Sequence, residues 1–369
     1  MKSVKFVFVF ILVFVVCASC AQQGNFRGKM SEFTESDVTK EVTPRVVKID
    51  SLHSRTFVVV DSLAIFYETL TRSHSFQVFN INNGKEVGRY CPIGHGNGEY
   101  MALSPISAIE NHGGLKTLLY APNESKRMVW DITESIKQNT TVMNDIRDFS
   151  AKEGSSSSSI SFMCGIGKDS VIVKLPATPI SNSEGIIPAR YQIRKLSTNE
   201  VLSEIQLFEN LENLDKIEGG VIMPGSFYSS FFSLKPDKSK FVETMMYLPQ
   251  INIVDISTGK AHGYKLQNYL ENTLEEKDFG KIMGYYVAAQ STDSNIFALF
   301  CGTTLPNASD GFDILHVYDW DGNMINKVKL KNPVHSIWLD SKNSLLYGLN
   351  ANENDLYCYK VSDLVAEKK

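Results

Sequence analysis

Residues 75–90 read SFQVFNINNGKEVGRY, and residues 251–266 read INIVDISTGKAHGYKL. In each segment an apolar stretch with interspersed polar positions leads into a short polar turn that contains glycine, and a second stretch follows. Such alternation indicates half-buried strands, and Asn-Gly or Thr-Gly supplies the positive φ that a tight hairpin requires. We therefore interpret both segments as β-hairpins, and their aligned turns as copies of one repeat.

Four weaker copies occur elsewhere: RMVWDITES from Arg127, YQIRKLSTNEVLSEIQL from Tyr191, ILHVYDWDGNMINKVKL from Ile314 and DLYCYKVSDL from Asp355. Alignment of the six copies gives one column of residues: Asn80, Asp131, Lys195, Asp255, Asp319 and Lys360. Pairs of strand-like runs precede several copies, at 159–165 and 169–175, 284–290 and 295–302, and 334–340 and 344–350. Four antiparallel strands repeated six times are the layout of a six-bladed β-propeller.

The two ends of the repeated region indicate how the ring closes. The last copy ends in VSDLVAEKK and lacks a fourth strand, while the run PRVVKID at 44–50 precedes the first copy and could supply it. Closure of this kind removes an exposed sheet edge. We therefore predict an all-β fold: a propeller of four-stranded antiparallel blades over residues 44–364, closed by an N-terminal strand, with a tail at 365–369. Runs of small residues at 105–109, 226–232 and 286–290 fit the crowded innermost strands. Short helical turns are expected in loops at 211–217 and 270–280.

The N-terminal stretch predicts export. Lys2 and Lys5 precede an unbroken apolar run at 6–16, which is too short to span a bilayer but suits a signal peptide. The run ends in Cys17-Ala18-Ser19-Cys20, which resembles the lipobox of bacterial lipoproteins, except that Cys17 replaces the usual aliphatic residue. The resemblance implies a signal peptide at 1–19 and lipidation of Cys20; the alternative is an ordinary secretory signal cut near Ala21.

Lipidation would anchor the protein to a membrane without a transmembrane helix. Ala21, with no neighbouring Asp, favours an outer-membrane address in the bacterial cell envelope over inner-membrane retention. Residues 20–43 are polar and lack a sustained apolar period, so the lipidated Cys20 and the residues after it are predicted to form a flexible tether.

The segment CPIGHGNGEYMALSP at 91–105 carries a further resemblance. It is similar to the Gly-x-Gly-x-Gly-Glu-aromatic stretch of TolB-like six-bladed β-propeller lipoproteins, through Gly94, Gly96, Gly98, Glu99 and Tyr100; Asn97 stands where that family often has Pro. The resemblance covers nearly the whole mature chain and implies a fold and an envelope location. It implies no activity, because most such proteins have none established.

Bulk composition excludes some partners. A net charge of −4 and a pI near 6 do not indicate the basic surface that binding of nucleic acid requires. No CxxC pair or HxxxH spacing occurs, so we predict no metal or other cofactor. Four cysteines remain after export, and they leave three disulfide pairings open: Cys91, Cys164, Cys301 and Cys358. We favour buried free thiols, because a domain of this size can fold around its hydrophobic core without disulfide bonds.

Candidate site residues are few, and no catalytic set is predicted. One hypothesis places His95 and Glu99 at the mouth of the central channel; a purely structural role for the glycine-rich segment is the alternative. Another has Tyr285 and His335 line a funnel for a sugar or peptide, together with Tyr228, Tyr286, Gln290 and Trp338, although packing between blades is the commoner role of aromatics.

Two functional hypotheses follow. The favoured one is a non-catalytic lipoprotein that binds or scaffolds a protein, peptide or glycan. The alternative is a metal-dependent propeller hydrolase or lyase that acts on a small ester or sugar.

Overall fold

The computed structural model describes residues 26–49, 54, 56–68, 73–111, 113–150, 160–180, 185–212, 214 and 220–365. The predicted signal peptide, Cys20 and the last four residues lie outside this part of the chain. Helices are short within it: α1 (Ile132–Gln138), α2 (Val361–Leu364) and the 3-10 turns η2 (Pro224–Ser226), η3 (Phe279–Lys281) and η4 (Leu305–Asn307). Across the described residues, no helix is both long and apolar enough to traverse a bilayer.

Strands make up most of the described chain, in sheets built from four antiparallel strands. The first sheet contains β4 (Phe57–Val60), β5 (Leu63–Tyr67), β6 (His74–Asn80) and β7 (Glu86–Pro92). The second contains β8 (Glu110–Asn111), β9 (Leu115–Ala121), β10 (Lys126–Asp131) and β11 (Met143–Asp148). The third contains β12 (Phe162–Gly165), β13 (Ser170–Leu175), β16 (Arg190–Lys195) and β17 (Val201–Ile205).

The later sheets repeat this plan. The fourth contains β19 (Ser230–Leu234), β20 (Lys240–Met245), β21 (Gln250–Asp255) and β22 (Ala261–Leu266). The fifth contains β23 (Met283–Ser291), β24 (Asn295–Thr304), β25 (Phe312–Asp319) and β26 (Met324–Val334). The last contains β27 (Ser336–Asp340), β28 (Leu345–Asn350), β29 (Asp355–Lys360) and, from the start of the chain, β3 (Arg45–Lys48).

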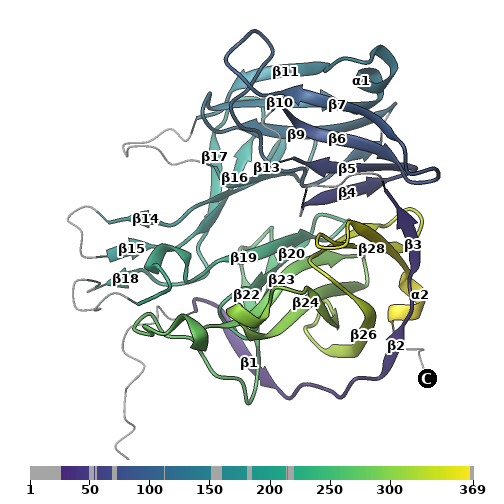
Figure 1. Ribbon diagram of the computed structural model, residues 1–369. Helices are drawn as coiled ribbons and strands as arrows, with labels where there is room; N and C mark the ends of the chain where they lie inside the picture. Colours follow the sequence, from purple (N-terminus) through teal and green to yellow (C-terminus); the bar gives the residue numbers. More distant parts are fainter. Residues whose placement is uncertain are drawn as a thin grey trace, which may run out of the picture.

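The sheets follow one another around a common centre in chain order, from purple through green to yellow (Figure 1). Three consecutive pairs of first strands touch near that centre: β19 and β23, β23 and β27, and β27 and β4. Between the second and third sheets, β9 touches β12. This is the arrangement of blades in a β-propeller, as the repeat predicts.

The aligned column of the sequence repeat has a structural counterpart. Each of its six residues is the last residue of the third strand of its sheet. In four sheets that residue is Asn or Asp, and its side-chain oxygen accepts a hydrogen bond from a backbone N–H that follows. The donors of Asn80, Asp255 and Asp319 lie in turns, at Asn82, Thr258 and Asp321. The donor of Asp131 is Glu134 in the first turn of α1, so Asp131 caps that helix. Such turns satisfy backbone groups locally. The repeat can therefore be recognised in the sequence, because an Asn or Asp with this hydrogen-bonding role recurs at the end of the third strand.

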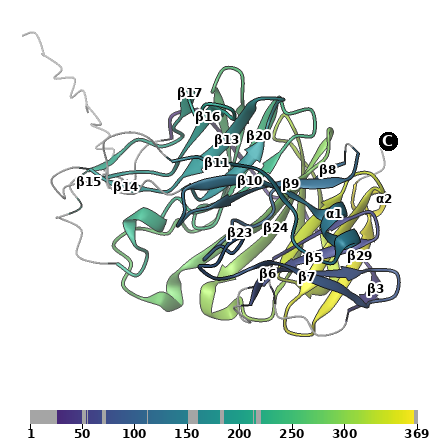
Figure 2. The ribbon, with the colours of Figure 1, turned by 90° about the horizontal axis from the view of Figure 1, so that it is seen from above.

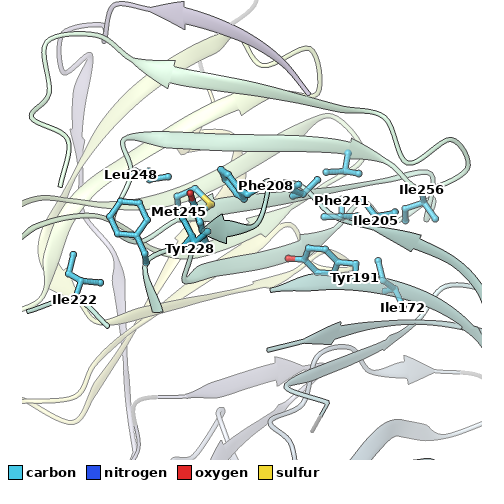
Figure 3. Close-up of a cluster of buried hydrophobic side chains, with 14 of the residues drawn as sticks. Ile172, Tyr191, Ile205, Phe208, Ile222, Tyr228, Phe241, Met245, Leu248 and Ile256 are labelled. Atoms are coloured by element: carbon cyan, nitrogen blue, oxygen red, sulfur yellow. The ribbon is translucent and has the colours of Figure 1, made fainter. Parts of the chain in front are cut away.

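Apolar side chains fill the spaces between neighbouring sheets. Figure 3 shows the cluster between the third and fourth sheets, where Tyr191 and Ile172 face Phe241 and Met245. The rings of Tyr191 and Phe241 lie 4.7 Å apart between centroids. Such aromatic contacts bury large areas and fix the angle between blades.

Residues 26–42 correct one prediction. A flexible tether is wrong for this stretch, because β1 (Lys29–Phe33) pairs in parallel with β22 and β2 (Lys40–Val42) pairs in parallel with β26. The purple chain runs along the outside of the sheets before it enters β3 (Figure 1). Its strands are mostly polar because only one face of an added edge strand is buried.

The segment that we expected to complete the last sheet does pair with it. β3 runs antiparallel to β29, with Val47 opposite Leu356 and Arg45 opposite Cys358. Val47 is buried with Leu356 in the cluster between the first and last sheets. A row of main-chain hydrogen bonds thus joins residues more than three hundred positions apart along the chain.

Other local predictions were less accurate. Residues 105–109 were expected to form an inner strand, but the inner strand of the second sheet is β8 alone. Residues 211–212 are the strand β18 rather than helix. With β14 (Thr178–Pro179) and β15 (Gly185–Ile187), β18 forms a small sheet at the margin of the molecule (Figures 1 and 2). Cys91, Cys164 and Cys358 are buried, Cys301 is partly buried, and these four are free thiols.

Candidate functional site

A cavity of about 760 Å³ lies where the first strands of the sheets converge. Its lining comes from all six of the larger sheets described above, largely near the turns from first to second strand. It includes residues 59–60, 107–111, 116–118, 164–165, 167–168, 232–236, 238, 290–291 and 338–342. Pockets for small molecules commonly have this size and are mostly apolar with a few polar groups. This cavity is therefore the candidate functional site.

The wall of the cavity exposes polar and apolar surface in similar amounts. It includes Val59 and Trp338, and the indole N–H of Trp338 donates a hydrogen bond of 2.9 Å to the carbonyl oxygen of Val59. That bond joins β27 of the last sheet to β4 of the first, so it holds the wall together where the chain's two ends meet. Phe232 contributes another aromatic ring from β19.

Hydroxyl groups in the wall bond to the protein itself. Thr117 donates to the carbonyl oxygen of Ala108, and Ser107 donates to that of Met163. The hydroxyls of Ser233 and Ser291 lie 2.9 Å apart between oxygens. These bonds tie neighbouring inner strands together, so the hydroxyl protons are engaged within the wall.

Five lysines line the cavity, and three of them have a carboxylate partner. Lys342 contacts Asp61 at 2.6 Å, Lys116 contacts Asp131 at 3.1 Å, and Lys235 contacts Asp237. Of the carboxylates in the lining, Asp340 accepts hydrogen bonds from the backbone and side chain of Asn343. Among the described residues, the charged groups of the lining without an ion-pair partner are two lysines and two carboxylates: Lys168, Lys238, Glu110 and Asp340.

Cys164 also lies in the wall. Burial raises the pKa of its thiol to about 11; the hydrogen bond with Ser107 and the charge of Lys238 lower it in part, and the charge of Glu110 adds to the rise. The thiol is therefore protonated at neutral pH and is a poor nucleophile. No group of three or more His, Cys, Asp or Glu side chains is placed to hold a metal ion within the described residues.

The four residues predicted as ligand contacts do not line this cavity: His95, Glu99, Tyr285 and His335. His95 is exposed in the loop after β7, and the carboxylate of Glu99 accepts a hydrogen bond of 2.9 Å from the backbone N–H of Gly96. A Cβ at Gly94 would lie 2.0 Å from that carboxylate. The glycines let the backbone wrap around Glu99, as the structural interpretation of the segment expects, and neither His95 nor Glu99 is among the residues that line the cavity.

Two residues named in the funnel hypothesis lie at the cavity. Gln290 and Trp338 line the cavity. Tyr285 is fully buried, with its hydroxyl donating to the carbonyl oxygen of Leu270, and His335 bonds through Nδ1 to the backbone N–H of Ala351. Tyr228 and Tyr286 are also buried in the cores between sheets.

The lysines of the cavity are functional candidates that sequence reasoning missed. Most of them lie at strand ends or in short polar turns such as 166–169 and 235–239, which read as ordinary hairpin connections. The spacing of these lysines in the sequence does not relate one to another. They line the same cavity only because sheets from distant parts of the chain surround it. These lysines could have been predicted from the sequence, because the turns from first to second strand lie at the same end of a propeller.

No family model and no curated protein matches the chain in sequence. Among solved structures, it is similar to a member of the DUF4221 family from Bacteroides vulgatus ATCC 8482, with a TM-score of 0.50, 15% identity, and 91% of this chain and 97% of that chain covered. This likeness supports a shared fold.

Two further solved structures resemble the chain with TM-scores below 0.5. A luciferin-regenerating enzyme has a TM-score of 0.48 and 12% identity over 88% of this chain and 97% of that one. The β-propeller domain of Myceliophteria thermophila Cps50 (Swd1) has a TM-score of 0.42 and 12% identity over 81% and 80%.

Proposed function

We propose that this protein is a lipid-anchored binding protein of the bacterial cell envelope, related to the TolB-like lipoproteins, whose six sheets form a closed six-bladed propeller around a ligand cavity. The observation that carries the proposal is the cavity of about 760 Å³, to which each of these sheets contributes. A cavity of that size accommodates a small molecule or the end of a peptide or glycan. The pairing of β3 with β29 and the bond from Trp338 to Val59 support closure of the ring.

Binding accounts for this cavity better than metal-dependent hydrolysis. An oxygen-rich metal site takes six to eight ligands. The carboxylates in the lining are Glu110 and Asp340, and Asn343 already occupies the oxygens of Asp340. The wall hydroxyls are bonded within the protein, and the one thiol in the lining is protonated.

A blocked cavity tests the binding function. Val60 lines the cavity, so Val60→Trp would fill part of it; Val201→Trp places the same side chain on the exposed outer strand β17. The full chain and both variants are incubated with a small-molecule extract of bacterial envelopes, desalted, denatured and examined by mass spectrometry. Compounds retained by the wild type and Val201→Trp, and lost from Val60→Trp, support the proposal. Equal recovery from all three contradicts it.

The lipid anchor has its own test. Cells that express the chain or its Cys20→Ala variant are fed an alkyne-bearing fatty acid, and labelled protein is followed through membrane fractionation. We expect label and membrane association for the wild type and neither for Cys20→Ala. Label that survives in Cys20→Ala would contradict lipidation at this residue.

A further inference from the structure

Three large apolar side chains are exposed together in the loops that lead into β19 and β23. Met223 is 70% exposed, Phe279 is 51% exposed and Val221 is 38% exposed, and all three line one small groove of about 120 Å³. The residues that line this groove carry no formal charge. Single exposed apolar residues are common, but apolar side chains that gather at one groove indicate a contact surface. We call these three residues the apolar patch.

The two loops that carry the apolar patch are held against each other and against the core. The backbone N–H of Val221 donates a hydrogen bond of 2.8 Å to the carbonyl oxygen of Glu276. The side chain of Asp278 caps η3, the turn in which the phenylalanine of the patch lies. Ile222 and Ile282 are buried in the cluster between the third and fourth sheets. The patch is therefore a fixed part of the folded surface.

The chain enters the described structure close to this patch. Phe26 is the first described residue, and it packs against the cluster that contains Ile222 and Ile282. Its ring centroid lies 5.4 Å from that of Phe208, which Figure 3 shows in the same cluster. Cys20 stands six positions before Phe26 in the sequence. A fully extended chain of that length spans at most about 20 Å, so acyl chains on Cys20 would enter a bilayer within that distance of Phe26.

We propose that the apolar patch rests in the surface of the lipid leaflet into which the acyl chains of Cys20 insert. The inference rests on the proposed lipid anchor and adds a second, direct contact with the same membrane. The anchor holds a bilayer within reach of the patch in every molecule, and apolar side chains leave water when they enter the boundary between headgroups and acyl chains. Because the groove is uncharged, salt should have little effect on the contact.

This contact would also orient the cavity. The loops of the patch precede the first residues of β19 and β23, at Ser230 and Met283. Residues near the other ends of these strands line the cavity, at 234–236 and 290–291. The nine residues of β23 span about 30 Å in extended form. With the patch on the bilayer, these lining residues face away from it, so a ligand reaches the cavity from the aqueous side.

Fluorescent labels at two positions test the contact. The full chain with Met223→Cys is purified from bacterial membranes, labelled with an environment-sensitive fluorophore and inserted into phosphatidylcholine vesicles with or without nitroxide-bearing lipid. Ser294→Cys is the matched control, because Ser294 is exposed in the turn between β23 and β24. The label at 223 should shift to shorter wavelength and lose most of its intensity to the nitroxide, and the label at 294 should do neither. The chain without an introduced cysteine corrects for labelling of the partly buried Cys301.

A charge placed in the patch tests whether the contact is apolar. Phe279→Glu, added to the Met223→Cys chain, should weaken quenching at 223 by about twofold or more, because a carboxylate resists transfer out of water. Ile146→Glu places the same charge on β11 of the second sheet, where Ile146 is exposed, and should leave the quenching unchanged. Cys20 is present in both variants, so attachment to the vesicles through the anchor should persist in both.

Mass spectrometry of the same samples shows whether Cys20 carries acyl chains, and so separates the two proposals. If the chain is acylated but the label at 223 is quenched no more than the label at 294, the inference is overturned and the anchor stands. A wavelength shift at 223 without quenching by nitroxide lipid would mean that protein, such as a second copy of this chain, covers the patch, and this also overturns the inference. A chain without acyl groups refutes the anchor, and the inference fails with it.

Discussion

Oε1 of Glu35 lies 2.7 Å from Nε2 of His316 and thereby joins the chain between β1 and β2 to the interior of the fifth sheet. Lys327 contacts the same carboxylate oxygen at 2.8 Å, and Tyr269 donates a hydrogen bond of 2.7 Å to Oε2. His316 is fully buried against Tyr286 and Tyr318. The N-terminal segment is therefore held by a specific polar contact as well as by strand pairing.

Protonation of Glu35 should loosen this contact. Burial by itself would raise the pKa of Glu35, but hydrogen bonds from His316, Lys327 and Tyr269 outweigh it and lower the pKa to about 2. A carboxyl whose pKa is depressed on folding stabilises the protein above its unfolded pKa near 4.5, and this stabilisation is lost as pH falls toward 2. Burial also lowers the pKa of His316, so the imidazole is neutral at neutral pH.

Glu35→Gln should accordingly lower stability at pH 7 by about 1–2 kcal/mol, allowing for solvent screening. Thermal unfolding measured from pH 7 to pH 3 checks this, and the difference from wild type should narrow below pH 4.5. Glu41→Gln, an exposed change on β2, should have little effect at any pH. A constant difference for Glu35→Gln across the whole pH range would contradict the assigned ionisation.

The turn residue Asp255 gives a second prediction. Its Oδ1 accepts hydrogen bonds from the backbone N–H of Thr258 and the hydroxyl of Ser257. Asp255→Ala should cost about 1 kcal/mol in the free energy of unfolding, because the turn loses its local acceptor. Asp255→Asn should cost much less, since Asn80 performs this role in the first sheet. Equal losses in denaturant melts of the two variants would show that the acceptor oxygen is unimportant.

A buried ion pair between the third and fourth sheets gives a third prediction. Glu243 contacts Lys174 at 3.2 Å and accepts hydrogen bonds from Tyr191 at 2.8 Å and Asn252 at 3.2 Å. Glu243→Met should destabilise the protein by about 3–5 kcal/mol, because it leaves an ammonium group buried without its partner.

The double variant Glu243→Met/Lys174→Met is the control for this pair. It should recover part of the loss, since no uncompensated charge remains. Chemical denaturation of both single variants and the double variant measures the coupling. Additive losses would mean that the two side chains act independently.

The repeat could be read from sequence because its third strands alternate in polarity and end at a turn residue with a defined hydrogen bond. Asn80 and Asp255 show this most clearly. The strand-like runs at 284–290 and 295–302 coincide with β23 and β24 for the same reason, since both are long and largely buried. Local patterns were sufficient wherever a strand is amphipathic or fully buried.

Features that depend on the assembled ring could not be read in this way. β1 and β2 add to the outer edges of two sheets with mostly polar residues, so their sequence resembles a tether. β8 has two residues, too few for any alternation. The site was missed for a related reason: Lys168 and Lys238 are seventy positions apart in the sequence, and they line one cavity only because the sheets that carry them are arranged around it.

Closure of the ring can be tested by a cross-link between β3 and β29. Arg45 lies directly opposite Cys358, which is a free thiol, so Arg45→Cys places two sulfhydryl groups across the seam. Oxidation of the purified variant should form this disulfide and raise stability by about 2–4 kcal/mol over its reduced form, because the bond restricts nearly the whole unfolded chain. Adding Cys358→Ala should abolish both the bond and the gain.

Peptide mapping of the oxidised Arg45→Cys variant by mass spectrometry, under non-reducing conditions, is the direct measurement. We expect a disulfide between the introduced thiol and Cys358 as the main product, because β3 and β29 hold the two positions opposite each other. An introduced thiol that stays free, or that pairs with another cysteine, would contradict a propeller closed by its N-terminal strand.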